Sequence, residues 1–185
     1  FNLFGSLRLG DFTLEASFHD RRKGIPTASF GTVFGDRRAN TVDRPAYVDL
    51  KFERNVAADW ELTARAYFDS YRYVGEYPYA AVLNKDQSTG SRVGVDTQLT
   101  GKILDRHTLT FGVELRDNLQ QDQFNCDLPT GTINLNEQRD SYNAGVFGQA
   151  EISLLTNLTF NAGLRFDHQS QSLDRVNPAR SEEHT

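Results

Sequence analysis

Five of the seven tyrosines lie close together, at Tyr67, Tyr71, Tyr73, Tyr77 and Tyr79. A tyrosine ring can stack on a flat chelate or a sugar while its hydroxyl hydrogen-bonds a polar rim. Tyrosines also gather where a protein meets the headgroup region of a membrane. We interpret Tyr77 and Tyr79 as ligand contacts, and Tyr67, Tyr71 and Tyr73 as aromatic residues at a membrane interface.

Basic residues precede the tyrosines in a polar stretch of the chain. Arg37 and Arg38 could attract an anionic ligand, because positive charges at the mouth of a site raise the rate of capture. Alternatively, they pair with lipid phosphates or with carboxylates such as Asp36 and Asp43. Both interpretations stay open, and Arg37 and Arg38 are candidate ligand-binding residues.

The spacing of the other polar residues does not support metal binding or catalysis. A metal site needs ligands at defined short spacings, whereas His19, His107 and His168 are far apart. No nucleophile elbow or paired nucleophile and base stands out. We therefore expect no metal site, no cofactor and no enzymatic activity.

Alternating apolar and polar residues indicate the elements that position these side chains. Along residues 158–167 every second residue is apolar, a period of two that a strand converts into two faces. The pattern recurs clearly at four other places and in shorter or interrupted form at three, namely 12–19, 61–68, 109–116 and 143–152, then 1–9, 46–55 and 91–102. The sequence thus predicts an all-β chain of about eight strands. Each strand approaches the roughly nine to eleven residues that cross a bilayer.

The connections between these strands alternate between short and long. Short links lie at 10–11, 57–59, 104–106 and 155–157, and the long connections are 22–44, 75–90 and 122–140. Outer-membrane β-barrels have short turns in the periplasm and long loops outside. The rhythm therefore predicts an antiparallel meander in the outer membrane, with Trp60, beside a short turn, as an anchor at the inner interface.

The composition fits such a chain. The net charge is −5, and acidic and basic residues are interleaved, so there is no basic stripe of the kind that binds nucleic acid. Mean hydropathy is −0.56, and no apolar run is long enough for a transmembrane helix. Low hydropathy does not argue against a membrane β-barrel, because half of the residues in each strand of a barrel can be polar. For the one cysteine, Cys126, we expect any disulfide partner to lie outside this chain.

The hairpin at 145–168 resembles a signature of TonB-dependent outer-membrane receptors. It reads GVFGQAEISLLTNLTFNAGLRFDH, and its matching residues are Phe147, Gln149, Glu151, Leu158, Ala162, Gly163, Leu164, Arg165, Phe166 and Asp167. Residues 25–54 are similar to a long loop and descending strand of the same barrels. The resemblance implies an arc of a transmembrane β-barrel of the roughly 22-stranded type, which on its own would be an open curved sheet.

The resemblance also implies a function. Such receptors lie in the bacterial outer membrane and import a scarce ligand, such as a ferric siderophore, cobalamin or a similar chelate, with energy from TonB. A small chelate would bind at the extracellular loops, and lipid would surround the strands. TonB would act through an N-terminal region outside this chain.

Two other functions stay open. Eight strands alone can close into a small membrane barrel, and a barrel can serve as a passive pore. A carbohydrate-binding β-sandwich would instead pack its apolar faces into a core. Its connections would be short at both ends, which the three long connections disfavour.

The two ends of the chain bear on its domain organisation. The chain has no methionine and opens within a predicted strand, so we expect the natural protein to begin upstream with a signal peptide. Residues 180–185, RSEEHT, resemble the translation of a sequencing adapter and are set aside. The expected domain is a partial receptor barrel over residues 1–179.

Overall fold

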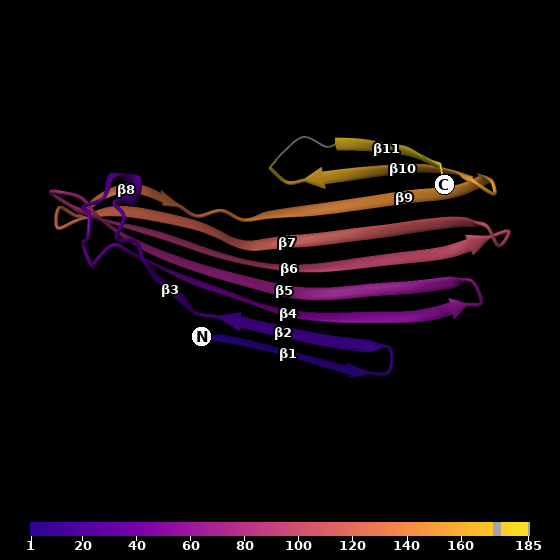
Figure 1. The fold of residues 1–185 in the computed structure, drawn as a ribbon, viewed down its shortest axis with the longest axis horizontal. Helices are drawn as coiled ribbons and strands as arrows, with labels where there is room; N and C mark the ends of the chain where they lie inside the picture. Colours follow the sequence, from indigo (N-terminus) through magenta and orange to yellow (C-terminus); the bar gives the residue numbers. More distant parts are fainter. Residues whose placement is uncertain (172–174, 185) are drawn as a thin grey trace.

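A computed structural model of the chain describes residues 1–171 and 175–184, with side chains described as far as Gln171. Apart from one short 3-10 helix, η1 (Ser29–Gly31), the regular structure is a single sheet (Figure 1). The sheet has eleven strands and follows the order β1-β2-β4-β5-β6-β7-β9-β10-β11, with β3 added to β4 and β8 added to β7.

The strand bounds show how the predicted pattern maps onto the sheet. The strands are β1 (Asn2–Leu9), β2 (Phe12–His19), β3 (Arg21–Gly24), β4 (Asn40–Ala57), β5 (Trp60–Pro78), β6 (Leu83–Ile103), β7 (His107–Leu128), β8 (Thr132–Glu137), β9 (Ser141–Leu155), β10 (Leu158–Gln169) and β11 (Arg175–His184). All eight predicted strands are present, as β1, β2, β4, β5, β6, β7, β9 and β10. β3, β8 and β11 were not predicted. Most of the segment set aside, 180–185, therefore lies in β11, whereas Thr185 is outside the described residues.

The short links are tight hairpin turns, as predicted. Gly10 has a φ of 59°, and Leu104 and Asp105 have φ values of 53° and 57°. Hairpins of this length favour left-handed backbone at their central residues, because that twist matches the twist of the strands. Four such turns lie at the same end of the sheet (Figure 1).

Two of the long connections are extended hairpins, which corrects the prediction of loops at 75–90 and 122–140. β5 and β6 are joined by residues 79–82 only, and β8 folds back on the end of β7 and pairs with it. Polar side chains predominate on both faces of these hairpins, so the alternation that marks a strand is weak although the strand pairing continues. Amide pairs support these polar strands; the Asn84 Nδ2 donates to Asn125 Oδ1 at 2.7 Å.

The remaining long connection, between β3 and β4, folds onto the end of the β5–β6 hairpin. The backbone amide of Ile25 donates to the carbonyl of Ala39 at 2.8 Å, and that of Val33 donates to the carbonyl of Pro78, also at 2.8 Å. Among the described residues, the buried apolar side chains are Ala39, Val42 and Pro78, all in this region. The sheet itself therefore has no packed core.

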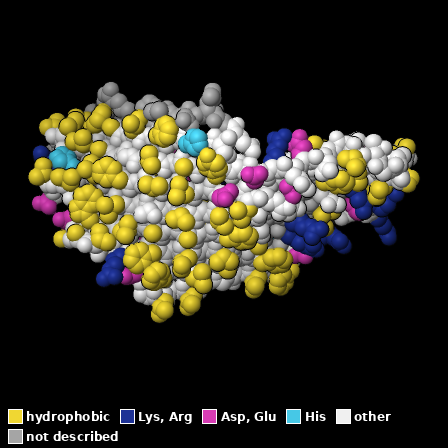
Figure 2. Space-filling view, turned by 180° about the vertical axis from the view of Figure 1, so that it is seen from behind, with side chains coloured by type: hydrophobic (Ala, Val, Ile, Leu, Met, Phe, Trp, Pro, Cys, Tyr) yellow, Lys and Arg dark blue, Asp and Glu magenta, His cyan; other side chains and the backbone are white. Residues whose placement is uncertain are grey.

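Apolar side chains of the sheet share one face. The register places Leu14 opposite Leu50, and Leu50 opposite Ala66. Many large apolar side chains on this face are exposed, among them Leu3, Leu7, Phe12, Leu14, Phe18, Val48, Leu50, Phe68, Val93, Val95, Phe111, Val113, Leu115, Val146, Leu164 and Phe166. Figure 2 shows apolar side chains spread over the strands, with basic side chains mainly toward the end that carries the long hairpins. We call this continuous surface the apolar belt.

The arrangement decides between the predicted architectures. A sandwich would cover the apolar belt with a second sheet, but the described residues form one sheet. β1 and β11 end the path without pairing with each other, so a closed eight-stranded barrel is not formed either. The predicted open antiparallel sheet is confirmed.

A register shift in the pairing of β6 with β7 separates the part of the sheet that carries the apolar belt from the long hairpins. Between Ser91 and Val93 of β6, the partner in β7 moves from Gln120 to Asp117. β7 thus has one residue more than β6 at this point, which is a β-bulge. Above the bulge, β7 exchanges β9 for β8 as its second neighbour.

Candidate functional site

The face opposite the apolar belt carries ion pairs that cross from strand to strand. Arg65 of β5 binds Asp49 of β4, and its Nη1 lies 3.8 Å from Asp96 Oδ2 of β6. Arg92 Nε of β6 binds Asp69 Oδ2 of β5 at 2.6 Å. A planar guanidinium suits such bridges because its donors match carboxylate geometry. These contacts define the polar face of the sheet.

The hairpin that resembles the receptor signature contributes a further cluster to the polar face. Arg165 Nη2 lies 2.7 Å from both Glu114 Oε2 and Asp167 Oδ1. Its guanidinium carbon is 5.8 Å from the ring centroid of Phe147, and that ring covers Gly112, where a Cβ would come within 2.2 Å. Arg165 of the AGLRFD stretch therefore ties β10 to β7 across β9, and Asp167 binds the same guanidinium from within β10.

A cavity of about 400 Å³ lies on the polar face where β2 ends and the long hairpins continue. We call it the mouth cavity. Its side chains come from five strands and include His19, Tyr47, Asp69, Tyr71, Arg92 and Gln121. Cationic, anionic, aromatic and amide groups thus converge on one hollow, which is the composition that orients a polar ligand.

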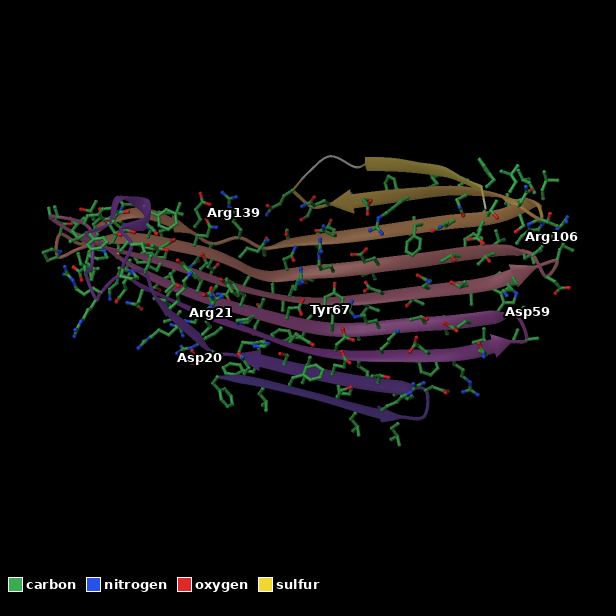
Figure 3. The ribbon with its side chains drawn as sticks, in the orientation of Figure 1. Asp20, Arg21, Asp59, Tyr67, Arg106 and Arg139 are labelled. Carbon is green, nitrogen blue, oxygen red and sulfur yellow. The ribbon has the colours of Figure 1, made fainter. Side chains whose placement is uncertain are left out.

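The tyrosines predicted at a membrane interface lie on the polar face. Tyr67 covers Gly94, where a Cβ would come within 2.2 Å of the Tyr67 ring, and the Arg65 guanidinium lies 4.8 Å from the Tyr67 centroid. Tyr71 donates its hydroxyl to Asp43 Oδ1 at 2.8 Å. In Figure 3, Tyr67 lies midway between the turn end, marked by Asp59 and Arg106, and the hairpin end.

Tyr73 belongs to the same face, nearer the hairpin tips. Its hydroxyl is hydrogen-bonded to that of Tyr77. Burial and this hydrogen bond raise the pKa of Tyr73. The three tyrosines thus face away from the apolar belt, so the geometry favours contact with polar partners, and an interface role stays a prediction.

Both tyrosines predicted to contact ligand meet the loop between β3 and β4. The Phe30 ring packs edge-on against Tyr77, with centroids 5.8 Å apart. Tyr79 donates its hydroxyl to the Phe30 carbonyl at 3.4 Å. The structure thus brings Tyr73, Tyr77, Tyr79 and Phe30 together, and we call these four residues the aromatic cluster.

The two candidate arginines of this loop differ in their surroundings. Arg38 forms an ion pair with Asp36: its Nη2 donates to Oδ2 at 2.7 Å, and its Nε donates to Oδ1 at 3.1 Å. Hydrogen bonds from the Arg38 side chain and backbone lower the pKa of Asp36. Arg37 is exposed, and within the described residues it forms no ion pair or side-chain hydrogen bond. Arg37 therefore keeps an unneutralised positive charge.

Trp60 lies at the other end of the sheet, at the start of β5. Its cross-strand partner is Gly101, and a Cβ on Gly101 would come within 2.1 Å of the indole. It shares the parity of Leu62 and therefore the side of the apolar belt. Its predicted role as an interface anchor stays a prediction.

Most residues of the mouth cavity were not identified from the sequence, among them Asp69, Arg92 and Gln121. Asp69 continues the odd-numbered positions of β5 that include Arg65 and Tyr67, so extending that alternation would have placed it on the polar face. Arg92 becomes its partner only through the register between β5 and β6. Gln121 lies beyond the bulge, where the alternation of β7 shifts.

Two further observations concern metals and membrane helices. In residues 1–171, no group of three or more His, Cys, Asp or Glu side chains is placed to hold a metal ion. Within the described part of the chain, no helix is long and apolar enough to span a membrane.

Comparisons with known proteins place this geometry in a family. Two solved structures share the fold: the ferric citrate transporter FecA in its unliganded form (TM-score 0.73, 8% identity, 98% of this chain and 32% of that chain), and the ferric yersiniabactin uptake receptor FyuA from Yersinia pestis (TM-score 0.71, 10% identity, 93% and 30%). The chain thus spans about a third of the length of these two structures. No curated protein matches it. A family model described as TonB dependent receptor-like, beta-barrel, matches residues 2–184, and the chain therefore belongs to the TonB-dependent receptor family as part of its β-barrel.

Proposed function

We propose that the chain forms part of the wall and outer mouth of a bacterial outer-membrane receptor that imports a ferric chelate with energy from TonB. The observation that carries this proposal is the separation of the two faces. One face is a continuous apolar belt suited to lipid, and the other bears ion pairs and the mouth cavity. A membrane-embedded β-sheet needs this division, because its outer side chains meet hydrocarbon and its inner ones meet water or protein.

The chemistry of the mouth supports a compact polar ligand with anionic groups. Arg37 on the loop above supplies an unpaired positive charge, and Arg92 in the mouth cavity supplies a guanidinium that is ion-paired with Asp69. Tyr77 and Tyr79 supply aromatic surface. Ferric chelates combine a charged coordination sphere with ring or carboxylate groups, which suits this set of side chains. The names of the two similar structures, a ferric citrate transporter and a ferric yersiniabactin receptor, agree with this ligand class.

The test is an uptake assay with the complete receptor that contains this chain. Cells without other iron receptors receive radioactive iron as ferric citrate or ferric yersiniabactin, with and without TonB. We expect uptake of at least one chelate that stops when TonB is absent. Uptake that continues without TonB would instead support the passive pore, and no uptake of either chelate would contradict this ligand class.

Two variants then test the mouth. Arg37→Gln removes the unpaired charge, and Tyr79→Ala removes a ring whose described hydroxyl contact is only one long hydrogen bond. Arg37→Gln should weaken chelate binding by about tenfold, the usual size of one charge-assisted contact. Tyr79→Ala should weaken it by about two- to tenfold, the size of one aromatic contact. Arg106→Gln, at the turn end, is the matched control. Equal binding by all variants would remove these two residues from the site.

A further inference from the structure

Two arginines lie opposite each other immediately above the apolar belt. Arg44 of β4 and Arg72 of β5 are direct cross-strand partners. Their neighbours Asp43 and Tyr71 hydrogen-bond each other on the polar face, and side chains alternate along a strand. Arg44 and Arg72 therefore project on the same side as the apolar belt.

The described protein balances only one of the two charges of this pair. Like charges directly opposite on neighbouring strands destabilise a sheet. Arg44 Nε lies 3.1 Å from Asp20 Oδ2, and both side chains are partly exposed. Arg72 is exposed, and within the described residues it has no ion pair or side-chain hydrogen bond. The two arginines and Asp20 therefore keep one net positive charge, which can attract an anion.

An apolar groove lies directly below the pair. It measures about 450 Å³, and its apolar-face lining includes Leu3, Ala16, Phe18, Ala46, Val48 and Phe68. Ala46 is two residues from Arg44 on β4, about 7 Å along the strand. The groove and the arginines therefore form one continuous surface.

We propose that this surface binds a phosphorylated, multi-acyl lipid of the outer leaflet. A phosphate bridges Arg44 and Arg72, and an acyl chain lies in the groove. Guanidinium groups bind phosphate through paired, charge-assisted hydrogen bonds. Charge complementarity above and apolar surface below select a lipid over a free anion or an uncharged chain. This inference rests on the proposed function, since it requires the apolar belt to face the membrane.

The experiment measures lipid binding by the complete receptor in detergent micelles. Native mass spectrometry counts bound diphosphoryl lipid A, with phosphatidylethanolamine as the zwitterionic comparison and inorganic phosphate as a competitor. The double variant Arg44→Gln/Arg72→Gln should weaken lipid A binding at least about tenfold. Gly5→Leu should also weaken it, because Gly5 borders the groove and has free space at its Cβ position. Arg54→Gln, on the same face near the turn end of β4, should have no effect.

Separate readouts distinguish this inference from the proposed function. Insertion into lipid vesicles is measured for every variant by flotation. A receptor that does not insert contradicts both proposals. Normal insertion with equal lipid A binding by the double variant and by Arg54→Gln overturns the lipid site alone, as does full displacement by inorganic phosphate. A species of twice the receptor mass, lost in the double variant, would assign the surface to a second copy of the chain and also overturn it.

Discussion

Replacing Gly94 with alanine should dislodge Tyr67 from the polar face of the sheet. The Tyr67 ring covers Gly94, and a Cβ there would come within 2.2 Å of the ring. No ordinary contact is that short, so the ring must move. Because Arg65 lies 4.8 Å from the same ring, the displacement also removes a cation–π contact next to the Arg65–Asp49 ion pair.

The expected cost has two parts. Forcing an extra carbon into a packed position costs about 1–3 kcal/mol, and a partly exposed cation–π contact contributes about 0.5–1 kcal/mol. The ring can relieve part of the clash by swinging toward the open face. We therefore expect Gly94→Ala to lower the free energy of unfolding by about 1–3 kcal/mol.

A double-mutant cycle measures this cost by urea unfolding in detergent. In a Tyr67→Ala background the clash is absent, so Gly94→Ala should change stability by less than about 0.5 kcal/mol. Gly163→Ala is the matched control, because Gly163 is also on the polar face and a Cβ there meets its nearest atom at 3.6 Å. Equal losses for Gly94→Ala and Gly163→Ala would refute the reasoning.

Two other predictions concern the hairpin of β7 and β8. Hydrogen bonds from Asn84 and Asn134 hold the pKa of Asp127 below its usual value of 3.8. The stability that these bonds give the hairpin should therefore be constant above about pH 4 and decrease as the pH drops through the lowered pKa. Hydrogen-exchange protection of the hairpin measures this decrease. In an Asn84→Ala variant this loss should move to higher pH, and an unchanged profile would count against the contact. For sidedness, a membrane-impermeant maleimide should label Cys126 on intact cells, whereas a cysteine replacing Asp59 in a Cys126→Ser background should react only after permeabilisation; the reverse pattern would invert the assigned orientation.

The sequence predicted those strands in which one apolar face produces a regular alternation of apolar and polar residues. Residues such as Phe160 and Leu164 alternate with polar neighbours because one face of the sheet is apolar. The tight turns were equally readable, since their lengths and residue types suit hairpins. The parts of β5, β6 and β7 beyond the apolar belt have no such alternation. The polar segment that contains Asn84 and Asn125 was therefore predicted as loop, although it is paired strand.

The candidate site was predicted less completely because it depends on register. Tyr67 shares its parity with Arg65, and carrying that alternation forward places Tyr71 and Tyr73 on the polar face as well. By contrast, the pairing of Asp69 with Arg92 requires the offset between two strands. No local pattern encodes that offset when the connecting segment is polar.

The bulge in β7 has a consequence for how such a receptor can diverge. Side-chain direction below Val93 is fixed by the surroundings of the wall, and a one-residue shift there would reverse every side chain. The bulge near Gln120 changes the register between β6 and β7 on its hairpin side only, and the pairing from Val93 to Ile103 stays regular. The hairpin above can therefore change in length without reversing the side chains of the apolar belt.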